Sequence, residues 1–207
     1  YNFNNDKATP EVFGFTDDDE SWEIRNNTSD RVVWKNANFG GTDWLNDFEG
    51  RHPDGNTDPT NLAALAAWIK STDTTGLSDS AKAARLAKFK SEIADWMDVD
   101  STLFYYLFTE LFLMVDSRAK NAFPTRYDNG VWCWLPYDMD TAIGINNEGA
   151  LAFEYHLEDT DYVDGEKVYN GQDSVLWINF RMCFPTEIRT MYQELRSNKS
   201  NPFSYQS

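Results

Sequence analysis

The strongest constraint on the fold is a long apolar run near the middle of the 207-residue chain. Residues 100–116, DSTLFYYLFTELFLMVD, open with Asp100 and Ser101, which can cap a helix, and then place apolar side chains on nearly every helical face. A helix that is apolar all round is buried on all sides. We therefore expect residues 101–116 to be the central helix of a single domain over 1–207, with Glu110, its one interior charge, held by an arginine or by backbone amides.

Three other segments carry apolar residues at three- and four-residue spacing, the periodicity of a helix packed on one face. The predicted helices are residues 57–73, entered through Asp58 or Thr60, residues 80–96, and residues 185–197, with Pro185 near the start.

Short alternating segments predict strands elsewhere in the chain. SWEIR (21–25) and RVVWK (31–35) read as a hairpin joined by residues 26–30, and a second hairpin within residues 122–144 turns at Asp128-Asn129-Gly130. Residues 150–173 are acidic and rich in turn residues, which indicates a surface excursion. Strands and helices that do not alternate regularly predict an α+β fold.

The net charge of −16 and the pI near 4.4 argue against nucleic acid as a partner, because the surface repels phosphate backbones. Divalent cations fit clustered carboxylates better, although acidity also serves solubility alone. No run reaches the roughly 18 apolar residues of a membrane span. Cys133 and Cys183 lack C-x-x-C spacing, so we expect buried thiols, and the sequence leaves one disulfide between them open.

Two groups of polar residues stand out against this apolar background. The first follows the central helix and contains Asp116, Arg118, Lys120 and Asn121, and the second is the pair Asp138 and Asp140. If residues 132–140 are extended, the two aspartates point to the same side and need a counter-ion. A metal ion is one candidate, and Arg118 or Lys120 is the other.

The order of these residues matches the requirements of phosphoryl transfer. That reaction uses an aspartate as base, an asparagine a few residues later on the metal, and a further metal-binding aspartate after a hairpin. Here Asp116 is followed by Asn121 at the five-residue spacing of protein kinases, then by the hairpin, and then by Asp138 or Asp140 ahead of Gly144.

YYLFTELFLMVDSRAKNAF and WCWLPYDMDTAIG resemble the spore-coat protein H (CotH) kinase-like family, in which a helix ending in Asp, a nearby Asn and an aromatic strand precede a PWDxDxxxG run. The opening YNFNNDK is similar to that family's GxYxxxE strand. The longer pattern, including DFEGR and GINNEGAL, is similar to CotH-like proteins of tailed phages and gut bacteria.

The resemblance implies an atypical protein-kinase-like fold, mostly its helical C-terminal lobe with a small N-terminal strand region. It implies phosphoryl transfer from ATP to protein hydroxyls with Mg²⁺ or Mn²⁺. By this resemblance Asp116 matches the catalytic aspartate, Asn121 the asparagine on the metal side, and Asp138 and Asp140 the metal-binding pair.

Two departures keep a second function open. The family's Pro-Trp is Pro136-Tyr137 here, and no phosphate-binding lysine with a covering segment is identifiable, since Lys7 and Lys35 qualify only as lysines. Either the chain is a fragment without its N-terminal lobe strands, or it is an inactive structural or adhesive component of a phage virion or bacterial surface. We expect a virion, spore-surface or extracellular location, with a protein substrate or surface proteins as partners.

A nucleotide-sugar transferase, the remaining reading of the D-x-D pattern, would need a doubly wound βα pattern, and the first 100 residues do not show one.

Overall fold

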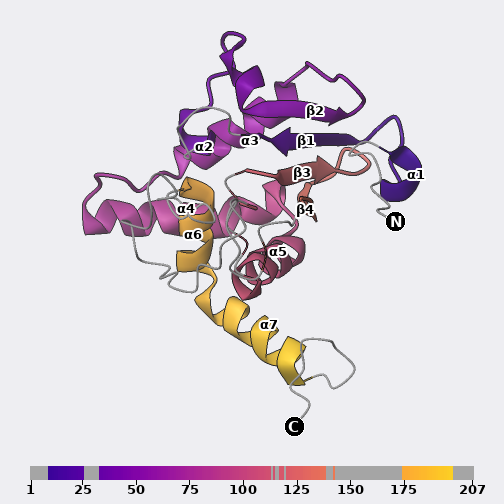
Figure 1. The fold of residues 1–207 in the computed structure, drawn as a ribbon. Helices are drawn as coiled ribbons and strands as arrows, with labels where there is room; N and C mark the ends of the chain where they lie inside the picture. Colours follow the sequence, from indigo (N-terminus) through magenta and orange to yellow (C-terminus); the bar gives the residue numbers. More distant parts are fainter. Residues whose placement is uncertain are drawn as a thin grey trace.

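The computed structural model describes residues 9–25, 33–112, 114, 117–118, 120–138, 142 and 174–197, and all structural statements concern these residues. Its sheet has four antiparallel strands in the order β2-β1-β3-β4 (Figure 1). The strands are β1 (Glu20–Ile24), β2 (Phe48–His52), β3 (Ala122–Arg126) and β4 (Trp132–Pro136). The strand nearest the N-terminus is therefore inside the sheet, between β2 and the β3–β4 hairpin.

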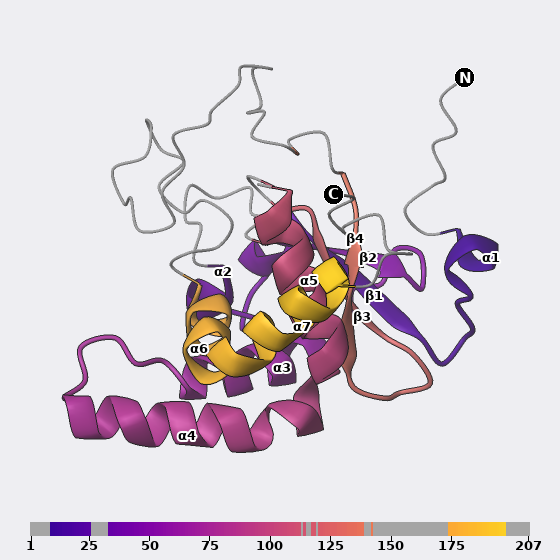
Figure 2. The same cartoon turned by 90° about the horizontal axis from the view of Figure 1, so that it is seen from below.

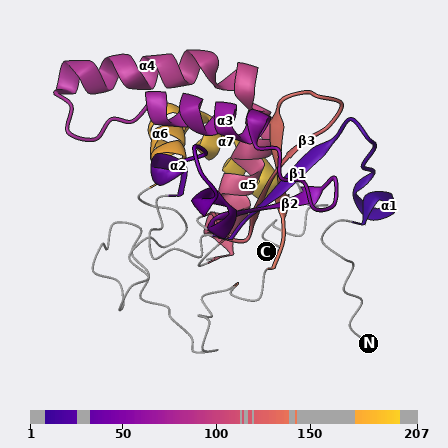
Figure 3. The ribbon, with the colours of Figure 1, turned by 90° about the horizontal axis from the view of Figure 1, so that it is seen from above.

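The helices gather beside this sheet, and the overall class is α+β, as predicted. They are α1 (Pro10–Phe13), α2 (Val33–Asn36), α3 (Thr60–Ser71), α4 (Asp79–Trp96), α5 (Val99–Leu111), α6 (Val175–Cys183) and α7 (Pro185–Ser197), with a 3-10 turn at Asp43–Asn46. Figures 2 and 3 show α3, α5 and α6 between the sheet and the long helix α4, with α1 at the end of the molecule opposite α4.

Local signals identified three helices and one hairpin correctly. Helix α3 begins at Thr60, whose backbone N–H donates to the Asp58 carboxylate over 3.1 Å. Helices α4 and α7 lie within a residue of the predicted ranges. The second hairpin turns at the predicted Asp128 and Asn129, whose φ angles of 51° and 54° are those that asparagine and aspartate adopt in tight turns.

The central helix is shorter and less enclosed than predicted. It is α5, which starts at Val99 under an Asp98 cap that accepts from the Ser101 N–H over 2.8 Å, and it ends at Leu111. Phe104 and Leu111 are 44% and 41% exposed, so one face of α5 is not covered. The apolar composition alone therefore predicted a more complete burial of α5 than the structure has.

The predicted strand RVVWK is wrong, because Val33–Asn36 forms the short helix α2. Trp34 is fully buried, and its ring packs against Phe48 of β2 and Trp134 of β4 at 5.6 and 6.4 Å. The strand β1 instead pairs with β2 and β3, which lie far from it in the sequence.

An aromatic cluster joins the sheet to the helices. The Trp134 ring of β4 stacks on Tyr105 of α5 at 5.6 Å and meets Trp177 of α6 at 5.0 Å. Both cysteines are free thiols, and burial raises the pKa of Cys133 to about 11. No described helix is long and apolar enough to cross a membrane. The predicted excursion at 150–173 lies outside the described residues.

Candidate functional site

The open end of the β3–β4 hairpin brings together two of the predicted site residues. Asn121 directly precedes β3, and Asp138 follows β4 by two residues. Because Ala122 pairs with Pro136 across the hairpin, both residues leave the sheet at the same end. Each has a left-handed backbone, with φ of 53° at Asn121 and 51° at Asp138, a conformation that Asn and Asp tolerate better than most residues.

Asn121 is held firmly by its backbone. Its backbone N–H donates to the Ile24 carbonyl of β1 over 2.8 Å, and the residue is only 6% exposed. Its carboxamide makes no hydrogen bond to any described residue. The oxygen of this carboxamide is of the type that binds hard cations.

The geometry at Asp138 corrects one expectation. Strand β4 ends at Pro136, and the left-handed Asp138 is exposed, so residues 132–140 are not one continuous extended segment. The argument that Asp138 and Asp140 project from one face of a strand therefore fails. Asp140 and the predicted base Asp116 lie outside the described residues, and their roles stay predictions.

Arg118 does not serve as the counter-ion of Asp138, contrary to one of the sequence-based alternatives. It is 3% exposed, and in the described part of the chain its guanidinium pairs with Glu110 of α5. The same group lies over the rings of Tyr106 at 4.6 Å and Trp177 at 5.7 Å. The expected arginine partner of Glu110 is thus confirmed, and Lys120, which is exposed, forms no ion pair with a described residue.

This buried arginine fixes the segment between α5 and β3, which carries Asp116 and Asn121 in the sequence. Trp177 donates its indole N–H to the Arg118 carbonyl over 3.3 Å, and the Tyr105 hydroxyl donates to the Ser117 carbonyl. Burial, together with the nearby Glu110 charge, raises the pKa of Tyr106, so that this hydroxyl stays neutral. Sequence analysis missed Trp177, since its only signal was an aromatic residue in an apolar run almost 60 positions away.

No group of three or more His, Cys, Asp or Glu side chains within the described ranges is arranged to hold a metal. A metal at the open end of the hairpin would therefore need Asp116 or Asp140 in addition to Asn121 and Asp138. Of the two upstream lysines, Lys35 bonds to Thr75 at 3.2 Å and pairs with Asp73 at 3.3 Å. Lys7 lies outside the described residues.

Comparison with protein families identifies a match. A family model described as "CotH kinase protein" matches residues 45–202, which is more than half of the chain. No curated protein matches the sequence. The matched range contains α5, the β3–β4 hairpin and every predicted site residue.

Proposed function

The chain belongs to the CotH kinase family, and on that basis we propose that it is a metal-dependent phosphotransferase that moves a phosphoryl group from ATP to protein hydroxyls. The observation that carries the proposal is that Asn121 and Asp138 leave the sheet at the same end of the hairpin, where the Asn121 carboxamide bonds to no described residue. The family membership and the order of residues along the chain support it.

Asp116 is the proposed general base. Five residues before Asn121, it is placed in the sequence to accept the proton of the attacking hydroxyl, as the corresponding aspartate of kinases does. The pair Arg118 and Glu110 contributes by holding the segment that carries Asp116 against α5 and α6. A base gains most when its position is fixed before the substrate arrives.

Asn121, Asp138 and Asp140 are the proposed holders of Mg²⁺ or Mn²⁺. Carboxylate and carboxamide oxygens are suitable ligands for these ions. When bound, the ion would neutralise charge on the phosphates of ATP. The left-handed turn at Asp138 lets the chain leave the strand and present its exposed carboxylate at the end of the sheet.

Labelling with radioactive ATP tests this function on the full-length protein in the presence of MgCl₂ or MnCl₂. Transfer to the protein itself or to an added protein substrate is expected. Replacing Asp116→Ala should slow transfer by about 10²- to 10⁴-fold, the usual contribution of a general base. Asn121→Ala should raise the concentration of Mg²⁺ needed for half-maximal transfer, and Asp54→Ala, an exposed carboxylate elsewhere, should behave as the unchanged protein.

Undiminished labelling in Asp116→Ala would contradict the assigned base. The second candidate function, a structural or adhesive component of a virion or cell surface, is favoured by one observation: Lys35 is engaged with Asp73 and Thr75, not free to bind phosphate. That function predicts no binding of Mg-ATP together with a melting temperature that still depends on the cation, because an ion that binds only the folded state stabilises it.

A further inference from the structure

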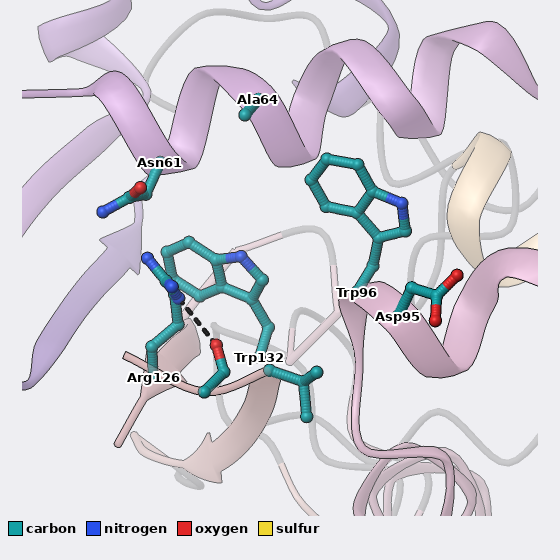
Figure 4. A pocket seen from close by; sticks show the side chains of 8 residues that line it. Asn61, Ala64, Asp95, Trp96, Arg126 and Trp132 are labelled. Carbon is teal, nitrogen blue, oxygen red and sulfur yellow. Dashed lines mark hydrogen bonds between the residues drawn. The ribbon is translucent and has the colours of Figure 1, made fainter. Parts of the chain in front are cut away.

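A small pocket lies at the turn end of the β3–β4 hairpin, between α3, the end of α4 and the start of β4 (Figure 4). Its volume is about 130 Å³. The register pairs Arg126 with Trp132 at this end and Ala122 with Pro136 at the other, so the pocket lies about 13 Å along the strands from the proposed metal site. It is therefore a separate site. The residues that carry the argument are Asn61, Ala64, Asp95, Trp96, Arg126 and Trp132.

Two tryptophans form rigid walls of this pocket. Trp96 stacks on Trp68 at 5.6 Å with 15° between the rings, which fixes its orientation. Trp132 is 3% exposed, and its carbonyl accepts from the Asp98 N–H over 2.8 Å. Trp132 therefore contributes an edge and not an open face, and the partly exposed Trp96 ring supplies the aromatic surface, which is already fixed before a ligand binds.

The indole N–H of Trp132 has no hydrogen-bond partner among the described residues. Figure 4 shows this nitrogen on the edge of the ring that faces Ala64 and Trp96. This nitrogen is not one of the unpaired polar atoms that are shielded from solvent, so water can reach it, and a ligand oxygen in the pocket would take the place of that water.

Arg126 lines the pocket without making it a site for anions. Its Nε donates to the Gly130 carbonyl and its Nη2 to the Asn129 carbonyl, both over 2.9 Å, and its Nη1 lies 3.5 Å from the Glu20 carboxylate. The guanidinium also lies 5.5 Å from the centre of the Trp132 ring. Its charge is thus matched within the protein, and the chain as a whole repels anions with its net charge of −16.

The remaining polar groups are hydrogen-bond acceptors. Asn61 donates its Nδ2 to Glu20 over 2.8 Å, which leaves its amide oxygen for other partners. The exposed carboxylate of Asp95 points away from Trp132 and Arg126, so this residue lines the rim of the pocket and does not place its charge inside it (Figure 4). The pocket therefore offers an aromatic surface, an unpaired donor and a neutral acceptor, a combination that matches neither a purely apolar ligand nor an anion.

We propose that this pocket binds a single sugar ring, a neutral hexopyranose. The C–H face of such a ring packs on an aromatic surface, and its hydroxyls both donate and accept hydrogen bonds. In this pose a hydroxyl donates to the Asn61 amide oxygen, and a ring or hydroxyl oxygen accepts from the Trp132 indole N–H. The pocket is smaller than the about 300–1,000 Å³ of drug-sized sites, which limits the bound part to one ring.

Titration with methyl glycosides of glucose, galactose, mannose and N-acetylglucosamine tests the proposal, with the indole N–H signal of Trp132 followed by NMR in ¹⁵N-labelled protein. At least one glycoside should shift this signal saturably at concentrations up to about 50 mM, which covers the millimolar Kd expected of a small, shallow site. Because Ala64 lines the pocket and its helix position is exposed, Ala64→Leu should fill the pocket and weaken binding at least fivefold.

The matched control is Ala67→Leu, an exposed alanine of the same helix that does not line the pocket, and it should bind as the unchanged protein does. Asn61→Ala should also weaken binding, because it removes the acceptor, whereas Asn46→Ala, an exposed asparagine outside the pocket, should not. Absence of a saturable shift with all four glycosides would overturn the proposal. It would equally fail if acetate or inorganic phosphate shifted the signal and no glycoside did, because Arg126 would then bind an anion. Both results are independent of phosphoryl transfer.

Discussion

At the scale of single residues, Arg118 shows that a charged side chain close to a candidate site can have a structural role. It lies between the rings of Tyr106 and Trp177 and is paired with Glu110, whose side chain is 17% exposed. Arginine suits this position because its planar guanidinium can stack on rings and still donate to a carboxylate. The segment that leads to Asn121 is thereby attached to two helices.

Replacing Arg118→Gln should lower the free energy of unfolding by about 3–5 kcal/mol, because Glu110 would keep a largely buried charge without a partner. Urea denaturation followed by circular dichroism measures this loss. The double change Arg118→Gln with Glu110→Gln should recover part of it, and Arg189→Gln, an exposed arginine of α7, should stay within about 0.5 kcal/mol of the unchanged protein. Equal losses in Arg118→Gln and Arg189→Gln would show that the buried pair contributes nothing.

At the scale of elements, the carboxylate of Asp19 is one of the groups that attach the β3–β4 hairpin to the chain before β1. Asp19, which is 4% exposed, accepts from the Thr16 N–H over 2.5 Å and from the Asp128 N–H in the hairpin turn over 2.7 Å. Burial opposes ionisation of Asp19, but these hydrogen bonds outweigh it and hold its pKa below the ordinary value.

This shift predicts how stability changes with pH. A carboxyl whose pKa is lower in the folded state stabilises the protein above its unfolded pKa of 3.8, and that contribution is lost as the pH falls through the folded pKa. Between neutral pH and about pH 3, unfolding free energy should therefore fall more steeply in the unchanged protein than in Asp19→Asn. Asp18→Asn, the exposed neighbour, should retain the steep fall. If the unfolding free energies of the unchanged protein and Asp19→Asn fell in parallel with pH, ionised Asp19 would not stabilise the fold.

The elements that could be predicted from sequence are those decided locally. Helix α3 and the hairpin turn depend on caps, periodicity and turn residues within a few positions of one another, so their sequences were sufficient. The segment RVVWK has the composition of a strand, yet it forms α2, because the place available for Trp34 lies between Phe48 and Trp134. That place is created by tertiary packing, which a local pattern does not encode.

The candidate site could likewise be predicted from the sequence only in part. The spacing from Asp116 to Asn121 and the hairpin that follows were readable, and the end of the sheet where Asn121 and Asp138 meet follows from that hairpin. The contact of Arg118 with Trp177 could not be predicted, because Trp177 comes from a helix near the other end of the sequence. The left-handed backbone at Asp138 could not be predicted either, since the alternating pattern before it predicted a longer strand.

At the scale of the whole molecule, the net charge of −16 is the dominant electrostatic feature. Self-repulsion of this size acts against the folded state, while ion pairs such as Arg51 with Glu23 and Glu49 act only locally. Salt screens exposed charges that are separated by more than about 10 Å at 0.1 M.

Raising NaCl from about 10 mM to about 300 mM should therefore raise the melting temperature by a few degrees, since about 1 kcal/mol corresponds to 2–4 °C in a chain of this size. Differential scanning calorimetry measures the change. MgCl₂ at equal ionic strength provides the comparison, and any additional rise reports binding and not screening. A melting temperature that falls with NaCl would mean that local ion pairs outweigh the repulsion.

The position of β1 in the sheet has a consequence for the order in which the protein can be built. Ser21 of β1 bonds to Thr125 of β3 through their hydroxyls, 104 positions apart. During synthesis on the ribosome, the edge of β1 that faces β3 stays unpaired until the hairpin emerges, and closing so long a loop costs entropy before the strand pairing compensates for it. Helices α3, α4 and α5 are synthesised between β1 and β3 and depend on local hydrogen bonds, so they can form before β1 pairs with β3. Completion of the sheet and the arrival of Asn121 beside Ile24 are then one event, and the candidate site exists only once the N-terminal strand has found its last partner.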